Sequence, residues 1–178
     1  PELADMSRRF KVGVILSLPL LVIAMSGMVP GFHLHASLSP TLLNWIQFIL
    51  ATPVVFWAGY PLLTRGYESF KTRNLNMFSL IGLGTLVAYV YSVIAILFPH
   101  VFPPSLLDAH TGLVGVYFES AAVIVVLVLM GQILELKARG QTSGAIRALL
   151  SLAPKTARVI LPDGHEEDRQ LESIKPGD

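Results

Sequence analysis

The sequence predicts an α-helical membrane protein with four transmembrane helices. The second of these bends into an amphipathic interfacial helix, and the fourth is followed by the beginning of a small β domain. Hydrophobic residues make up 53% of the chain and charged residues only 14%, a balance typical of membrane proteins. The charges are also confined to a few segments that separate long uncharged runs, and the lysines and arginines fall in alternate segments.

The composition excludes several classes of function. The chain has no cysteine, which excludes disulfides, thiolate metal sites and cysteine nucleophiles within it. Its net charge is +1, and it has no basic cluster interleaved with aromatic residues, so we expect no nucleic-acid partner. Because the chain begins at Pro1 and stops inside a polar segment at Asp178, we expect it to be a piece of a longer protein.

The first uncharged run extends from Val12 to Val29 and has the length of a membrane span. Residues 1–11 before it are polar and basic, and we expect them to form a cytoplasmic segment with Ser7 as a candidate helix cap. A signal peptide is the alternative for this region. The length of the run and the lack of a small-residue cleavage site after it disfavour that alternative.

The second run extends from Leu42 to Gly59 and does not end cleanly. Its continuation, YPLLTRGYESFKTR (60–73), repeats apolar residues at helical spacing with charges between them. That pattern favours a helix lying in the membrane interface. Gly59 and Pro61 provide the means for a bend. Residues 12–74 are therefore predicted to form one pair of helices with an interfacial continuation.

The third run, Leu75–Phe98, contains Gly82 and Gly84, which permit close helix packing. The fourth begins near Gly112 and continues through Leu150 without a helix-breaking pair. Residues 75–150 are therefore predicted to form a second pair of helices, whose last member extends out of the membrane.

From Ser151 onward the sequence predicts strands. Thr156–Leu161 is rich in strand formers, and Pro162-Asp163-Gly164 is typical of a turn. Residues 151–178 are too few to bury a core of their own. We expect them to be the start of a small β domain.

The positive charges predict the orientation. Lysines and arginines occur in the N-terminal segment, after the second run and after the fourth, whereas the loops after the first and third runs have none. By the positive-inside rule, both ends of the chain are expected in the cytoplasm. We predict an integral membrane protein of a bacterial plasma membrane.

Two acids mark the fourth helix as a candidate ion path. Glu119 and Glu135 are separated along one helix by about 24 Å, close to the thickness of a bilayer core. Ionisable groups at such positions mark ion or substrate paths. An ordinary interfacial acid is the alternative for each, the more so for Glu135, which has Lys137 and Arg139 nearby. From the residues alone, the prediction is a path for a cation.

Met77 lies at the inner end of the third helix. Methionine is usually a core residue, but a thioether beside a carboxylate suits a soft monovalent cation such as Cu(I) or Ag(I). The histidines of the outer loops can bind metal but are interpreted as solvated; they are His33, His35, His100 and His110. The sequence contains no recognisable catalytic centre.

The stretches LNMFSLIGLGTLVAYVYS (75–92) and VYFESAAVIVVLVLMGQILELKARGQTSGAIRALLSLAPKTARVI (116–160) resemble the heavy-metal branch (class IB) of the P-type ATPases, and within it the copper(I) exporters. The resemblance extends from about Arg8 to Asp178 and is most specific over Leu75–Ile160. It implies a translocase that exports Cu(I), with Ag(I) as a second substrate, and that uses ATP and Mg bound outside this chain.

The resemblance also implies roles for the segments. Residues 12–74 would be the helix pair specific to this branch, residues 75–150 the first two helices of the transport core, and residues 151–178 the start of the actuator domain. The bend would form a platform at which a soluble copper chaperone, or the protein's own N-terminal metal-binding domain, docks. Gly59 would supply the bend, although relatives typically have a Gly-Gly pair there, and the docking residues would be Arg65 and Lys71.

For the ion, the resemblance implies an uptake site at Met77 and Glu135 and a release role for Glu119. Two alternatives stay open: a zinc or cobalt pump of the same branch, and a non-enzymatic four-helix membrane channel or anchor. The Cys-Pro-Cys and Asp-Lys-Thr-Gly motifs that distinguish them do not occur in this sequence.

Overall fold

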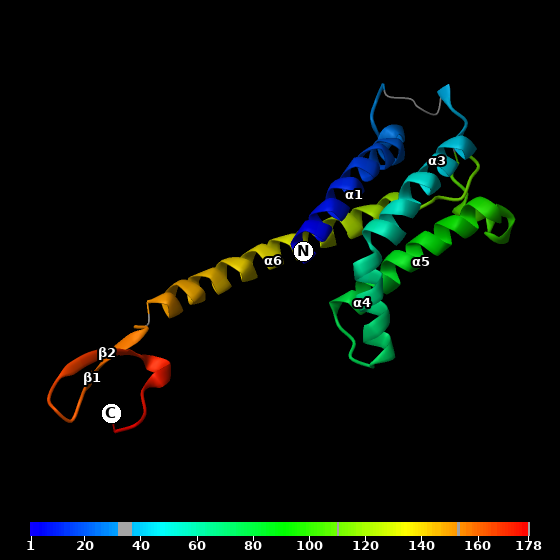
Figure 1. The fold of residues 1–178 in the computed structure, drawn as a ribbon. Helices are drawn as coiled ribbons and strands as arrows, with labels where there is room; N and C mark the ends of the chain where they lie inside the picture. Colours follow the sequence, from blue (N-terminus) through cyan, green and yellow to red (C-terminus); the bar gives the residue numbers. More distant parts are fainter. Residues whose placement is uncertain (32–36, 110, 153, 178) are drawn as a thin grey trace. The chain divides into compact units, whose positions relative to one another are not determined.

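A computed structural model describes residues 1–31, 37–109, 111–152 and 154–177 (Figure 1). His33, His35 and His110 lie outside the described residues. Four of the helices are long and apolar enough to cross a membrane, and a two-stranded sheet follows the last of them. The predicted fold class is confirmed. The chain divides into two compact units, Pro1–Leu134 and Glu135–Asp178.

The first spanning helix, α1, covers Glu2–Met25 and continues as a 3₁₀ turn, η1, over Ser26–Met28. The prediction that Ser7 caps this helix is wrong, because α1 begins five residues earlier. Glu2 and Asp5 lie in the first turn, where negative charge interacts favourably with the helix dipole. Their presence explains why the helix extends through the polar N-terminal segment.

The second spanning helix, α3, covers Pro40–Pro53. The side chain of Ser39 caps it, and a proline at its first position matches the preference of helix N-termini. A π-helical turn, η2, follows over Val54–Ala58, and the amphipathic helix α4 covers Tyr60–Lys71 after Gly59. Figure 1 shows α4 leaving the line of α3. The predicted bend is therefore present, and it takes the form of a π-helical turn ended by a glycine.

The third spanning helix, α5, covers Met77–Leu97 and begins with a capping box. The Asn76 side chain accepts hydrogen bonds from the backbone N–H groups of Phe78 and Ser79, and the Ser79 hydroxyl accepts one from the N–H of Asn76. This exchange of hydrogen bonds fixes the first turn of α5. It also fixes the backbone of Met77, the first residue of the helix.

Helices α4 and α5 pack closely through glycine. A methyl group at Gly66 would lie 2.6 Å from the carbonyl oxygen of Phe78, and the backbone of Gly82 lies nearby. The hydroxyls of Ser69 and Ser79 form a buried hydrogen bond between the same two helices. Gly82 thus has the predicted packing role. Gly84 does not, because no described atom lies within 4 Å of a methyl group placed there.

The fourth spanning helix, α6, covers Phe118–Ser151 and is one continuous helix of 34 residues. Before it, the backbone N–H of Tyr117 donates to the hydroxyl of Ser92 at 2.7 Å, which ties the start of α6 to α5. An isolated β-bridge between Leu107 and Val114 holds the preceding loop. The predicted absence of a break between the apolar and polar parts of this helix is confirmed.

The core of the first unit lies where α3, α5 and α6 meet. Phe118 is fully buried, and its ring contacts Phe48 and Tyr89 at centroid distances of 5.9 and 5.7 Å. The Tyr89 hydroxyl hydrogen-bonds the Thr52 hydroxyl at 2.7 Å, so its polar group is satisfied inside the apolar core. These contacts hold the first turn of α6 against α3.

The second unit consists of the polar part of α6 and a β-hairpin. Strands β1 (Thr156–Ile160) and β2 (Glu166–Gln170) pair antiparallel. Gly164, at a φ of 82°, adopts a left-handed conformation in the connecting turn. A short 3₁₀ turn, η5, follows over Leu171–Ser173. The predicted strand and turn after Ser151 are present.

Candidate functional site

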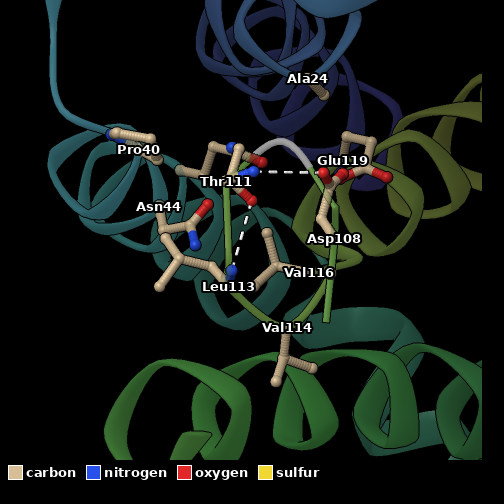
Figure 2. Close-up of a pocket in the computed structure, with 11 residues that line it drawn as sticks. Ala24, Pro40, Asn44, Asp108, Thr111, Leu113, Val114, Val116 and Glu119 are labelled. Atoms are coloured by element: carbon tan, nitrogen blue, oxygen red, sulfur yellow. Dashed lines mark hydrogen bonds between the residues drawn. The ribbon is translucent and has the colours of Figure 1, made fainter. Parts of the chain in front are cut away.

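A polar cavity of about 190 Å³ lies beside the first turn of α6, at the end of the first unit that is predicted to face outward. It is bounded by α1, α3, the loop before α6 and the first turn of α6. Figure 2 shows Asn44, Asp108 and Glu119 around it. The lining residues with polar side chains come from three different segments and are Asn44, Gln47, Asp108, Thr111 and Glu119. Glu119, the candidate release acid, therefore lines a cavity.

Two oxygen atoms of this lining are buried without a hydrogen-bond partner among the described residues. They are Oε2 of Glu119 and Oε1 of Gln47, whose residue is only 6% exposed. The other oxygen of Glu119 accepts a long hydrogen bond of 3.4 Å from the Ser120 hydroxyl. A buried oxygen without a donor costs free energy. These two atoms are therefore suited to receive water or a cation.

Asp108 shapes the loop beside the cavity. Its carboxylate accepts a hydrogen bond from the backbone N–H of Thr111 at 3.3 Å, drawn in Figure 2. Its backbone N–H donates to the Leu113 carbonyl, and its carbonyl accepts from the N–H of Gly112. Gly112 has a φ of 66°, a conformation that glycine adopts without strain. These hydrogen bonds close the loop on itself just before α6.

The two residues predicted to form the uptake site, Met77 and Glu135, lie at exposed helix positions. Met77 is 57% exposed at the start of α5 in the first unit. Glu135 begins the second unit, and its carboxylate forms an ion pair with Arg139 one turn further along α6. Within the described residues, no group of three or more His, Cys, Asp and Glu side chains could hold a metal ion.

The bend at Gly59 depends on close approach of the backbone. A methyl group there would lie 2.5 Å from the carbonyl oxygen of Val55 and 3.2 Å from both methyl carbons of Val125 on α6. The N–H of Gly59 donates to the Val54 carbonyl at 2.9 Å, which closes the π-helical turn. Only glycine fits this position without displacing its neighbours. One glycine is sufficient for the bend, and Ala58 before it is fully buried.

Arg65 links four helices of the first unit. Its Nη1 donates to Oε1 of Gln132 on α6 at 2.8 Å, and its Nη2 pairs with Oε1 of Glu2 on α1 at 2.7 Å. Its guanidinium also lies over the ring of Phe78 on α5, 5.3 Å from the centroid. Lys71, the last residue of α4, is exposed. The two predicted docking residues therefore have different surroundings.

Two residues with clear structural roles were missed from the sequence. Arg9 donates to the carbonyl of Trp57 in the bend, lies over the Trp57 indole and pairs with Asp5 at 2.8 Å. Nothing in the sequence pattern indicates that contact. Gln47 could have been found, since an amide inside an apolar spanning run is itself a sign of a functional position.

Comparison with known proteins identifies relatives along nearly the whole chain, although no family model matches it. The chain is 53% identical, over 99% of its length, to a silver exporting P-type ATPase of Salmonella typhimurium. It is 49% identical to a copper-exporting P-type ATPase of Legionella pneumophila and 50% identical to a copper-transporting P-type ATPase of Rhizobium leguminosarum, in both cases over its full length. The chain spans 21%, 24% and 21% of these relatives, respectively. Similarity at this level along the whole chain means that it belongs, as one membrane portion, to the heavy-metal P-type ATPases.

Proposed function

We propose that the full-length protein exports Cu(I) and Ag(I) across the membrane, driven by ATP hydrolysis. The observation that carries this proposal is 49–53% identity, along nearly the whole chain, to relatives named as silver or copper exporters. Those names favour copper and silver over the zinc or cobalt alternative. ATP and Mg would bind to parts of the protein outside this stretch.

The chemistry of the inner side supports a soft monovalent ion. The thioether of Met77 is a ligand type that Cu(I) and Ag(I) prefer, and the carboxylate of Glu135 would supply the compensating negative charge. In the described structure that carboxylate is paired with Arg139. An arriving cation would therefore compete with Arg139 for Glu135, which keeps this end of α6 charge-balanced when no metal is bound.

The continuous helix α6 provides the proposed coupling. Its first turn carries Glu119, and the same helix continues without a break through Glu135 to Ser151, five residues before the β-hairpin begins at Thr156. We propose that motion of the actuator domain, of which this hairpin is the beginning, acts on α6 directly. Both ends of the chain would lie in the cytoplasm, in keeping with the lysines and arginines at those positions.

The proposed function predicts which metal ions stimulate ATP hydrolysis. Purified full-length protein should hydrolyse ATP faster when Cu(I) or Ag(I) is added, and Zn(II) or Co(II) at the same free concentration should give no comparable increase. Stimulation by Zn(II) but not by Cu(I) or Ag(I) would establish the zinc alternative. Hydrolysis that no metal changes would remove the proposal altogether.

We propose that α4 is the docking platform for a copper chaperone or for the protein's own metal-binding domain. Lys71 is the sharper test of docking, because Arg65 also ties α4 to α1 and α6. Neutralising Lys71 should lower activation by carrier-bound Cu(I) about two- to fivefold, as expected for an exposed charge at a binding surface. Activation by free Cu(I) should not change.

For Arg65→Ala the expectation differs from that for Lys71→Ala. Carrier-dependent activation should fall, and the midpoint of thermal unfolding in detergent should fall with it, since α1 and α6 lose a common hydrogen-bonding partner and α5 loses the guanidinium over Phe78. For the Lys71→Ala variant described above, an equal loss of activation by carrier-bound Cu(I) and by free Cu(I) would count against docking at this surface.

A further inference from the structure

The backbone carbonyl of Trp57, in the bend between α3 and α4, lacks its usual helical donor. In an α-helix this carbonyl would accept a hydrogen bond from the N–H of the residue four positions later. That residue is Pro61, which has no N–H. A carbonyl without a donor at the edge of a membrane costs free energy. The bend therefore needs a donor from another part of the chain.

Arg9 of α1 supplies that donor. Its Nη1 donates to the Trp57 carbonyl, its Nε donates to Oδ2 of Asp5 at 2.8 Å, and its guanidinium lies 5.1 Å from the centroid of the Trp57 indole. The Arg9 side chain is only 16% exposed, although it belongs to the polar N-terminal segment. A planar guanidinium that contacts a carbonyl, a carboxylate and a ring is held in one orientation, unlike a solvated arginine.

A second contact of α1 lies on the other side of the bend. Glu2 and Arg9 are about two helical turns apart, so their side chains lie on one face of α1. Oε1 of Glu2 accepts a hydrogen bond from Nη2 of Arg65 on α4 at 2.7 Å. Arg9 thus holds the chain before Gly59 and Glu2 holds it after Gly59. Helix α1 bridges the bend.

The same face of α1 packs closely in its next turns. Met6 is only 2% exposed. A methyl group at Gly13 would lie 3.3 Å from Cγ2 of Val126 on α6 and 3.8 Å from Cβ of Ala58 in the π-helical turn. The polar contacts of α1 are therefore continuous with an apolar contact to the bend itself, and they are not isolated surface ion pairs.

We propose that α1 holds the bend between α3 and α4, and that Arg9 is the positioning residue that sets the direction in which α4 leaves it. This inference rests on the proposed docking of a copper carrier at α4. A preorganised surface binds its partner at a lower entropic cost than one that must first be ordered. Arg9 thus promotes delivery of Cu(I) from the carrier while contacting neither the carrier nor the ion.

The first measurement reads the bend directly, without a carrier. Spin labels on a non-natural keto amino acid replace Ile49 on α3 and Tyr67 on α4, which are both exposed. Pulsed electron paramagnetic resonance then gives the distribution of distances between the labels in the full-length protein. We expect Arg9→Gln to widen this distribution or add a second distance, because the Trp57 carbonyl loses its donor.

Arg8→Gln is the matched control. Arg8 is the neighbouring residue, has the same charge, is exposed, and lies over the same indole at a longer distance of 6.0 Å from the centroid. Its replacement should leave the distance distribution of the wild type. If Arg9→Gln gives the same distribution as Arg8→Gln, the inference is overturned.

The second measurement separates positioning from general damage to the protein. Arg9→Gln should raise the concentration of carrier-bound Cu(I) at half-maximal stimulation of ATP hydrolysis about tenfold, as loss of a hydrogen bond from a charged group would. Half-maximal stimulation by free Cu(I), and the maximal rate, should stay at the wild-type values. Equal shifts with carrier-bound and free Cu(I) would overturn the positioning role.

The wild type distinguishes failure of this inference from failure of the proposed function. Wild-type protein that free Cu(I) stimulates and carrier-bound Cu(I) does not would remove the proposed docking, and the positioning role with it. Wild-type protein that neither form stimulates would remove the proposed function itself.

A second variant keeps the inference testable if Arg9→Gln shows no thermal unfolding transition. Glu2→Ala removes the contact beyond the bend, and because the Glu2 side chain is 56% exposed, little packing is lost. It should also widen the distance distribution and raise the half-maximal concentration of carrier-bound Cu(I). A folded Glu2→Ala protein with the distribution and half-maximal concentration of the wild type would overturn the inference.

Discussion

Full-length protein carrying Met77→Leu or Glu135→Gln should lose most of its Ag(I)-stimulated ATP hydrolysis at low free metal concentration. Met77→Leu keeps the volume and removes the sulfur, and Glu135→Gln keeps the shape and removes the charge. Changes to residues that only support a metal ligand cost about 10–100-fold in affinity, so loss of a ligand should cost at least as much. The measurement is the free Ag(I) concentration at half-maximal stimulation.

Changes at Met77 and Glu135 should alter metal binding without unfolding the protein. Met77 is more than half exposed at the first position of α5, whose first turn is fixed by the Asn76 capping box. Its replacement by leucine should therefore leave thermal unfolding unchanged. Glu172→Gln, at an exposed position after the hairpin, controls for loss of a carboxylate. Half-maximal stimulation at the wild-type Ag(I) concentration in both variants would reject the uptake site.

Gly59→Ala should lower the thermal unfolding midpoint of the full-length protein in detergent. The added methyl group would meet a backbone carbonyl oxygen at 2.5 Å and the side chain of Val125 at 3.2 Å. The carbonyl oxygen belongs to Val55 in the closed π-helical turn and cannot move aside as a flexible side chain can, so the turn itself must distort, and Val125 of α6 must also give way. Overpacking of this kind costs about 1–3 kcal/mol. The same change should weaken activation by carrier-bound Cu(I), because the platform begins at this bend.

Gly84→Ala is the matched control for this prediction. It makes the same substitution inside α5, where no described atom lies within 4 Å of the new methyl group and where alanine favours the helix more than glycine does. Its unfolding midpoint should equal or exceed that of the wild type. If the two variants shift the midpoint equally, the close approach at Gly59 does not contribute to stability.

The sequence was sufficient to predict the spanning helices, and the reason is physical. A membrane span must be long, apolar and internally hydrogen-bonded, so its presence follows from a local pattern. The continuity of α6 followed likewise from the lack of a helix-breaking pair before Leu150. Helix starts were predicted less well. The helix α1 begins at Glu2, before the polar segment ends, because charges near a helix start stabilise it without changing the hydrophobic pattern.

The π-helical turn before Gly59 could not be predicted in detail. Glycine and proline indicated a bend, but the form of the bend depends on how closely α6 approaches, and Val125 lies far away in the sequence. The contacts of Arg65 could not be predicted either, because they too involve residues far away in the sequence. Its spacing placed it on the polar face of α4, and only the fold shows that this face meets Glu2 and Gln132.

Some residues of the candidate ion path could likewise be predicted from the sequence, and others could not. Glu119 could be singled out because a carboxylate at the end of a spanning helix is unusual. Its cavity could not be predicted, because the loop around Asp108 and the middle of α3 come together only through the aromatic core. Gln47 was missed although an amide inside an apolar spanning run is itself a signal, and only the fold shows that it lines the same cavity as Glu119. The roles of Met77, Glu135 and Glu119 stay predictions.

The central claim is that this chain lines the path of a soft monovalent cation exported at the expense of ATP. The most direct measurement is uptake of Ag(I) into inside-out membrane vesicles containing the full-length protein. We predict uptake that requires ATP, that excess Zn(II) does not reduce, and that falls to the level of empty vesicles in Glu135→Gln. ATP-independent uptake, or uptake equal to that of empty vesicles in the wild type, would contradict the claim.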